Sequence, residues 1–128
     1  MTQEEKRLLL KDLSARFPYD TIVSVTDGTI KYEAYIESVS YKYIQVSPVS
    51  GSVFTAYTFY KISEVKPYLR PMSSMTEEEK IDFQSFFNYD GVEYPEEYID
   101  WLNAHHIDYR GLIGVGLALE APEGMYKN

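Results

Sequence analysis

The sequence predicts a single α+β domain built on a small antiparallel β-barrel or strongly curved sheet, of the SH3-like or Sm-like kind. Three observations support this fold class: β-rich runs between residues 19 and 72, an amphipathic segment before them, and further helical patterns after them. We expect an N-terminal helix in 1–18, the barrel or sheet in 19–72 and a helical C-terminal part in 73–128. The 128 residues fit one domain, 1–128.

Four runs predict the strands of the sheet. Residues 21–27 are β-branched and end in Asp27-Gly28, the signal of a tight hairpin turn. Residues 30–37 and 41–47 alternate, so that one face is apolar; its members are Ile30, Tyr32, Ala34, Ile36, Ile44 and Val46. Residues 53–62 are apolar on both faces, as in a strongly curved barrel. Residues 63–72 contain two prolines and are expected to form a final edge strand or a connector.

Capping signals predict where the helices begin. Thr2 and Thr76 are each followed three residues later by a glutamate, which is the capping-box pattern. The first helix should end near Arg16 and carry an apolar stripe; the stripe consists of Leu9, Leu10, Leu13 and Phe17. The second should end near Phe87. Pro95 suits the first turn of a third helix, which should end near His105 or His106, and residues 117–120 are expected to add a short edge strand.

The net charge of −8 is concentrated in one segment. Residues 1–75 carry nine Lys/Arg and eight Asp/Glu, whereas residues 76–100 carry nine Asp/Glu against Lys80 alone. Because non-specific nucleic-acid binding needs a basic surface, this balance argues against a general DNA or RNA binder. A near-neutral barrel still permits stacking on single strands.

Other compositional features narrow the class of protein. The absence of cysteine excludes disulfides and thiolate metal sites. No apolar run is long enough to predict a membrane span, and the charged amino terminus lacks the core of a signal peptide. We therefore expect a cytoplasmic protein without membrane association.

Three tyrosines are the candidate binding residues. If Ile36, Ile44 and Val46 face the core, the side chains on the opposite face point outward; these include Tyr35, Tyr43 and Tyr57. Outward aromatic rings on a curved sheet can stack on bases or hold a peptide. The alternative interpretation is that the helices cover these rings.

His105, His106 and Asp108 form the second candidate site, a metal or polar cluster. Imidazole and carboxylate groups bind zinc and carry protons. Adjacent helical residues point about 100° apart, however, so both histidines do not readily reach one metal ion. A hydrogen-bonded histidine at a helix end is the favoured interpretation, and no cofactor is expected.

Two stretches resemble segments of an uncharacterised family of short proteins from gut bacteria and their phages or integrated elements. They are KPYLRPMSSMTEEEK (66–80) and HHIDYRGLIGVGLALEAPEGMYK (105–127), together with the LLLKDL pattern near the start. The resemblance covers about the last half of the chain. It implies a cytoplasmic, phage-associated accessory protein, and it brings no activity and no site residue with it.

The sequence favours a non-enzymatic binding or interaction module, with another protein as the expected partner. One alternative is a single-stranded nucleic-acid binder that uses the outward tyrosines with Lys31, Lys42 and Lys61. The other is a metal-dependent hydrolase at the His-His-x-Asp segment. No catalytic motif is visible, so an enzyme is the less favoured class. Homo-oligomerisation is left open, because an exposed edge strand can pair with a copy of itself.

Overall fold

The structure is a computed structural model that describes residues 1–49, 58–88, 91–92 and 95–126. Helix α1 (Gln3–Arg16) and the 3-10 turn η1 (Phe17–Tyr19) precede four strands: β1 (Ile22–Asp27), β2 (Ile30–Val39), β3 (Ile44–Pro48) and β4 (Phe59–Tyr60). The next elements are η2 (Ile62–Glu64), β5 (Val65–Leu69), η3 (Met72–Ser74) and α2 (Glu77–Gln84). The last are β6 (Phe87–Asn88), β7 (Gly91–Val92), α3 (Pro95–Ala104) and β8 (Leu119–Glu120).

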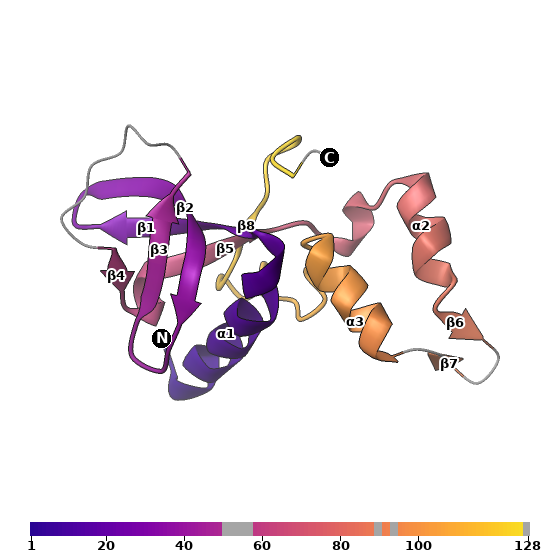
Figure 1. Cartoon of the computed structure of the whole chain (residues 1–128), viewed down its shortest axis with the longest axis horizontal. Helices are drawn as coiled ribbons and strands as arrows, with labels where there is room; N and C mark the ends of the chain where they lie inside the picture. The colour runs from indigo at the N-terminus through magenta and orange to yellow at the C-terminus, as the bar shows by residue number, and fades with distance from the viewer. Residues whose placement is uncertain (50–57, 89–90, 93–94, 127–128) are drawn as a thin grey trace.

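Six strands form one curled sheet in the order β4-β3-β2-β1-β5-β8 (Figure 1). This confirms the predicted α+β class and the strongly curved sheet. In the described part of the chain the two outer strands, β4 and β8, do not pair with each other, so the sheet is a half-barrel with two edges. One pair departs from the antiparallel expectation, because β5 and β8 are parallel. The long excursion through α2 and α3 supplies the crossover that a parallel pair requires.

The first hairpin follows the predicted pattern closely. Strands β1 and β2 pair from Ile22↔Tyr35 to Asp27↔Ile30, and Gly28 adopts a positive φ of 62° in the two-residue turn between them. The predicted inner face is buried along β2, except that Ile30 lies at the turn and is 50% exposed. A register shift between Ile36 and Ser38 marks a bulge in the β2–β3 pair, which bends the strand and contributes to the curl.

Helix α1 packs against the inner face of the sheet. Its capping box is present as predicted, with the Glu5 amide donating to Thr2 Oγ1 at 3.1 Å. Leu9 and Leu13 are fully buried against strand residues that include Val23, Val25, Ile44, Val46, Val65 and Leu69. Phe17 was predicted on the same stripe, and this was wrong: it is 43% exposed. The helix ends at Arg16, the chain turns into η1, and Arg16 occupies the buried position instead.

Two other strands differ from expectation. Residues 63–72 were expected to form a final edge strand or a connector, but β5 is a strand inside the sheet, between β1 and β8. Pro67 is tolerated there because β8 pairs only with Tyr68 and Leu69, so no neighbour on that side requires the missing N–H. The predicted strand in 53–62 is represented by Phe59–Tyr60, and residues 50–57 lie outside the described chain. The expected short edge strand near the C-terminus is present as β8.

The segment from α2 to α3 forms an arm that projects from the sheet (Figure 1). Helix α2 begins at its predicted Thr76 capping box but ends at Gln84, before the predicted Phe87, because Phe87 begins the β6–β7 hairpin. Aromatic rings fill the arm, with Phe83 centred 5.5 Å from Tyr98 and 6.0 Å from Trp101.

The arm is tied to β5 by a bidentate ion pair. Arg70 at the end of β5 donates to both carboxylate oxygens of Glu79 in α2, at 2.7 and 2.8 Å. These hydrogen bonds lower the pKa of Glu79 to about 2.

In the described residues, no helix is both long and apolar enough to cross a membrane.

The contrast between Leu13 and Phe17 gives the first testable prediction. Leu13→Ala should lower the free energy of unfolding by about 2–5 kcal/mol, because it leaves a cavity in the core. Phe17→Ala should cost about 1 kcal/mol or less, because the side chain is already half in water. Urea denaturation followed by circular dichroism measures both variants. Equal losses of unfolding free energy in the two variants would contradict a buried Leu13 and a half-exposed Phe17.

Candidate functional site

A cleft of about 330 Å³ lies between the N-terminal half of α1, the loop that joins β2 to β3, and the start of η2. We call it the cation–tyrosine cleft; it is lined by Gln3, Lys6, Arg7, Leu10, Tyr41, Lys42, Tyr43, Lys61, Ile62 and Ser63. The α1 residues recur at spacings of three and four, so a single helical face supplies them. The remaining residues come from two distant parts of the sequence that the sheet brings to the same place.

Local hydrogen bonds shape the two non-helical walls of the cleft. In the β2–β3 loop, the Ser40 hydroxyl donates to Tyr43 O at 2.8 Å and accepts from Tyr43 N at 3.2 Å. This closed turn holds Tyr41 and Tyr43 outward, 80% and 48% exposed. At the other wall, Glu64 accepts from the Lys61 amide at 2.9 Å. That carboxylate is thereby bound to the backbone, and it does not line the cleft.

The charge in the cleft is opposite to the charge of the protein. Lys6, Arg7, Lys42 and Lys61 supply four cations, and the lining contains no aspartate or glutamate among the described residues. Within the same part of the chain, none of the four takes part in an ion pair. The acidic segment belongs to the α2–α3 arm, which lies at the opposite end of the molecule from the N-terminus of α1 and the β2–β3 loop (Figure 1).

Two apolar residues, Leu10 and Ile62, also line the cleft, and we call them its floor. Leu10 and Ile62 are partly buried and pack against the main core, which holds this part of the cleft in place. The site therefore combines positive charge at its rim, two phenol rings on one wall and an apolar surface below. Such a combination suits an anionic ligand that also has a planar or apolar part.

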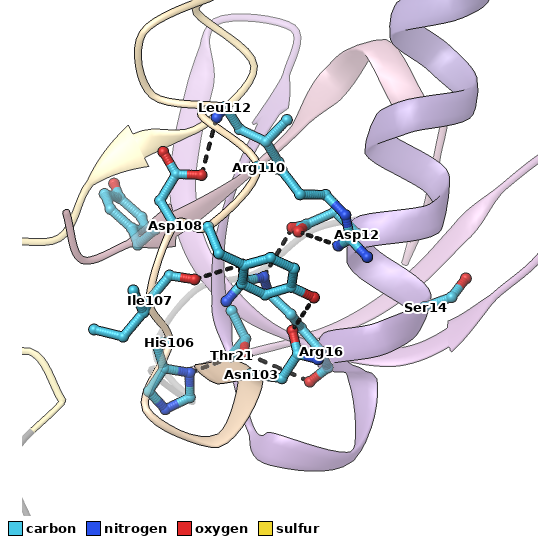
Figure 2. A network of polar contacts seen from close by, with 12 residues as sticks. Asp12, Ser14, Arg16, Thr21, Asn103, His106, Ile107, Asp108, Arg110 and Leu112 are labelled. Carbon is cyan, nitrogen blue, oxygen red and sulfur yellow. Dashed lines mark hydrogen bonds and ion pairs between the residues drawn. The ribbon is translucent and has the colours of Figure 1, made fainter. Parts of the chain in front are cut away.

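A buried ionic network fixes the helix that carries half of the cleft. Asp12 accepts from Arg16 Nε at 2.9 Å through one carboxylate oxygen and from Arg110 Nη1 at 2.8 Å through the other (Figure 2). Arg16 Nη2 donates to the carbonyl of Ile107 at 2.8 Å. Both Asp12 and Arg16 are fully buried. Among the described residues, Arg16 Nη1 has no hydrogen-bond partner, but the guanidinium lies 5.2 Å from the centre of the Tyr109 ring.

His106, a predicted metal or polar residue, ends α3. It has a positive φ of 61°, and the His106 and Ile107 amides donate to Asn103 O and Leu102 O, which is a Schellman motif. The His106 ring stacks on Tyr126 at 3.7 Å, and its Nδ1 lies 3.0 Å from Thr21 Oγ1. Burial, with the nearby charge of Arg16, lowers the pKa of His106 to about 4, so the ring is neutral at pH 7.

The other two members of the predicted cluster point elsewhere. The His105 ring stacks on Trp101 at 4.0 Å, and its Nδ1 lies 2.8 Å from the Trp101 carbonyl. Asp108 accepts from the backbone amides of Leu112 and Ile113 at 2.9 and 3.0 Å. Across the residues that the structure describes, no three His, Cys, Asp or Glu side chains are grouped to hold a metal ion.

The three predicted binding tyrosines do not form one surface. Tyr43 lines the cation–tyrosine cleft, whereas Tyr35 lines a second, polar hollow of about 290 Å³ with His106 and Tyr126. Tyr57 lies outside the described residues. Tyr126 is held in the wall of this hollow, because its hydroxyl donates to Tyr68 O at 2.6 Å and accepts from the Ile22 amide at 3.0 Å.

Sequence reasoning found part of the cleft and missed the rest. It named Tyr43, Lys42 and Lys61, together with Lys31, which the structure places on β2 outside the cleft. It missed the contribution of α1 and of Tyr41. Two signals were available: the helical spacing of Gln3, Lys6, Arg7 and Leu10, and the alternation of aromatic and basic residues in Tyr41-Lys42-Tyr43.

The buried network gives the second prediction. Asp12→Leu alone should cost about 3–5 kcal/mol in unfolding free energy, because it leaves Arg16 buried without its carboxylate. Arg16→Met alone should cost less, because Asp12 keeps its ion pair with Arg110. The double variant Asp12→Leu/Arg16→Met should cost clearly less than the sum, because both charges leave together. Chemical denaturation of all four proteins gives the coupling energy. Additive losses would show that the pair is not energetically coupled.

His106 gives a pH-dependence prediction. The pKa of His106 is about 4 in the folded protein, against an ordinary histidine value of 6.5 in the unfolded chain. Between these values the unfolded chain binds more protons, so the free energy of unfolding should fall as the pH is lowered from about 6.5 to about 4. His106→Asn should flatten this part of the curve, since asparagine tolerates the positive φ and does not titrate.

The matched control for this experiment is His105→Asn, which alters the neighbouring imidazole and leaves His106 in place. Urea denaturation at a series of pH values measures both curves. If the free energy of unfolding of His106→Asn falls with pH as steeply as that of the wild type, other groups cause the pH dependence.

Comparison of the chain with protein-family models, with curated proteins and with solved structures gave no match. The resemblance to the family from gut bacteria and phages therefore stays a prediction. Among the described residues, those of the cation–tyrosine cleft are the ones most clearly arranged for a ligand.

Proposed function

We propose that this protein is a non-enzymatic binding module whose ligand site is the cation–tyrosine cleft. The ligand is an anion that carries a planar or apolar part. One observation supports this most strongly: four cations without an ion pair in the described chain line a cleft with no carboxylate, in a protein of 20 acidic and 12 basic residues. A chain with such an excess of carboxylates has many ways to pair its cations.

The helix itself does not favour this arrangement. Lys6 and Arg7 lie in the N-terminal half of α1, whereas the helix dipole favours cations at the C-terminal end. They are also neighbours in sequence, and two more cations approach from other segments. A bound anion would relieve the mutual repulsion of these charges and would be attracted by all of them.

The lining of the cleft supports binding and not catalysis. Its polar side chains in the described chain are cations, tyrosines, Gln3 and Ser63, with no histidine or carboxylate to serve as a general base. The site can therefore attract and orient a ligand. We further propose a setting in a phage or mobile-element process, which rests on the resemblance of residues 66–80 and 105–127.

The test is a charge reversal inside the cleft compared with one outside it. Lys6→Glu/Arg7→Glu should weaken binding to heparin, a sulfated polyanion, by about tenfold or more at low salt, because two cations become two anions. Lys11→Glu/Lys66→Glu makes the same change in net charge at two exposed positions that do not line the cleft. Biolayer interferometry at several salt concentrations measures both.

The control variant Lys11→Glu/Lys66→Glu should bind heparin only about twofold to threefold more weakly, because of the change in overall charge. If both double variants weaken heparin binding equally, or if neither protein nor variant binds heparin, the cleft is not the anion site. Thermal unfolding by circular dichroism confirms that both variants are folded, as expected for substitutions at exposed side chains.

A further inference from the structure

We infer that the ligand of the cation–tyrosine cleft is a short stretch of single-stranded nucleic acid. This inference rests on the proposed function and narrows its ligand class. Two features of the cleft point to it: cations that come from several separate chain segments, and tyrosine rings that are held in solvent beside them.

The cations suit a chain of phosphates better than a single anionic group. Lys6 and Arg7 belong to α1, Lys42 to the β2–β3 loop and Lys61 to the residue before η2. One phosphate is satisfied by one or two such groups, whereas successive phosphates of a strand need cations spread along a path. Arg7 adds a planar fork of donors, which matches phosphate oxygens in a bidentate manner.

The tyrosines suit unpaired bases. Aromatic side chains are usually buried for most of their surface, yet Tyr41 is 80% exposed and Tyr43 is 48% exposed. In the part of the chain that the structure describes, neither ring packs against another aromatic ring. The Ser40 turn fixes the backbone of the loop that carries both rings. Bases stack on rings presented in this way, with little preference for sequence.

The size of the cleft favours a single strand over a duplex. At about 330 Å³ it is at the scale of a small-molecule pocket, with Leu10 and Ile62 at its floor. An unpaired base can place its flat face against a ring or against this floor. In a duplex the base faces are stacked inside, so only phosphates and groove edges remain for contact. A duplex would meet the rim cations and leave the tyrosines and the floor unused.

The protein is acidic as a whole, so we expect its contact with a nucleic-acid strand to be short. The arm, with helices α2 and α3, lies at the opposite end of the molecule from the N-terminus of α1 and the β2–β3 loop, which line the cleft (Figure 1). With at most four cations in contact with phosphates, the slope of log affinity against log salt should be no steeper than about −3 for a single strand. The binding should therefore be weak and sensitive to salt, and confined to a few nucleotides.

The experiment compares ligands that share charge and differ in bases. Fluorescence anisotropy at low salt uses a labelled oligothymidylate and oligouridylate of about twelve nucleotides, a duplex of the same length, and polyglutamate. We expect both single strands to bind, and the duplex and polyglutamate to bind at least about tenfold more weakly. Tighter binding of the duplex or of polyglutamate would overturn the inference.

Tyrosine variants test stacking separately from charge. Tyr41→Leu/Tyr43→Leu should weaken oligothymidylate binding by about tenfold and change heparin binding by less than about twofold. Tyr41→Phe/Tyr43→Phe keeps the rings and should retain oligothymidylate affinity within about threefold. If Tyr41→Leu/Tyr43→Leu weakens oligothymidylate and heparin binding equally, the rings do not act by stacking on bases.

The outcomes separate this inference from the proposed function. If Lys6→Glu/Arg7→Glu abolishes heparin binding and no oligonucleotide binds, the cleft is an anion site and the nucleic-acid inference is wrong. If heparin binding does not depend on Lys6 and Arg7, both proposals fail.

Discussion

The buried carboxylate of Asp12, held between Arg16 and Arg110, is the interaction on which the rest of the structure depends. Removing a charge from water costs several kcal/mol per ion, so such a group persists only when its geometry is satisfied. Asp12 uses one oxygen for each arginine, and Arg16 reaches on to the Ile107 carbonyl. The network thus joins the first helix to the segment after α3 and admits one placement of α1, because a shifted helix would leave these charges buried and unpaired.

The placement of α1 in turn decides both the core and the cleft. One side of the helix contributes Leu9 and Leu13 to the interior of the curled sheet, and another carries Lys6, Arg7 and Leu10 to the cation–tyrosine cleft. Leu10 serves both, because it packs against the core and forms part of the cleft floor. The ligand site is therefore built on a helix whose position the buried network sets, and the β2–β3 loop and the segment at η2 add the remaining residues.

The distribution of charge explains how an acidic protein can present a cationic site. The arm carries most of the acidic excess and is attached through the Arg70–Glu79 pair, in which hydrogen bonding lowers the pKa of Glu79 to about 2. In the body of the protein, two acidic groups near the cleft or its helix are engaged elsewhere: Asp12 is buried in the network, and Glu64 binds backbone at η2. The cations of the cleft are left facing solvent. Net charge therefore describes the molecule poorly at the scale of a binding site.

The sequence by itself determined the features that depend on neighbouring residues. Period-two alternation identified the buried face of β2, the Thr2 and Thr76 capping boxes identified two helix starts, and Asp27-Gly28 identified the hairpin, because each rests on contacts within a few residues. Only the tertiary structure decided that Arg16 and not Phe17 is buried, since a charged side chain becomes favourable there through Asp12 and Ile107 O, and Ile107 is 91 residues away. It also decided the cleft. Lys6, Lys42 and Lys61 are ordinary surface cations in the sequence, and they form a site because the curl of the sheet and the position of α1 bring three distant segments together.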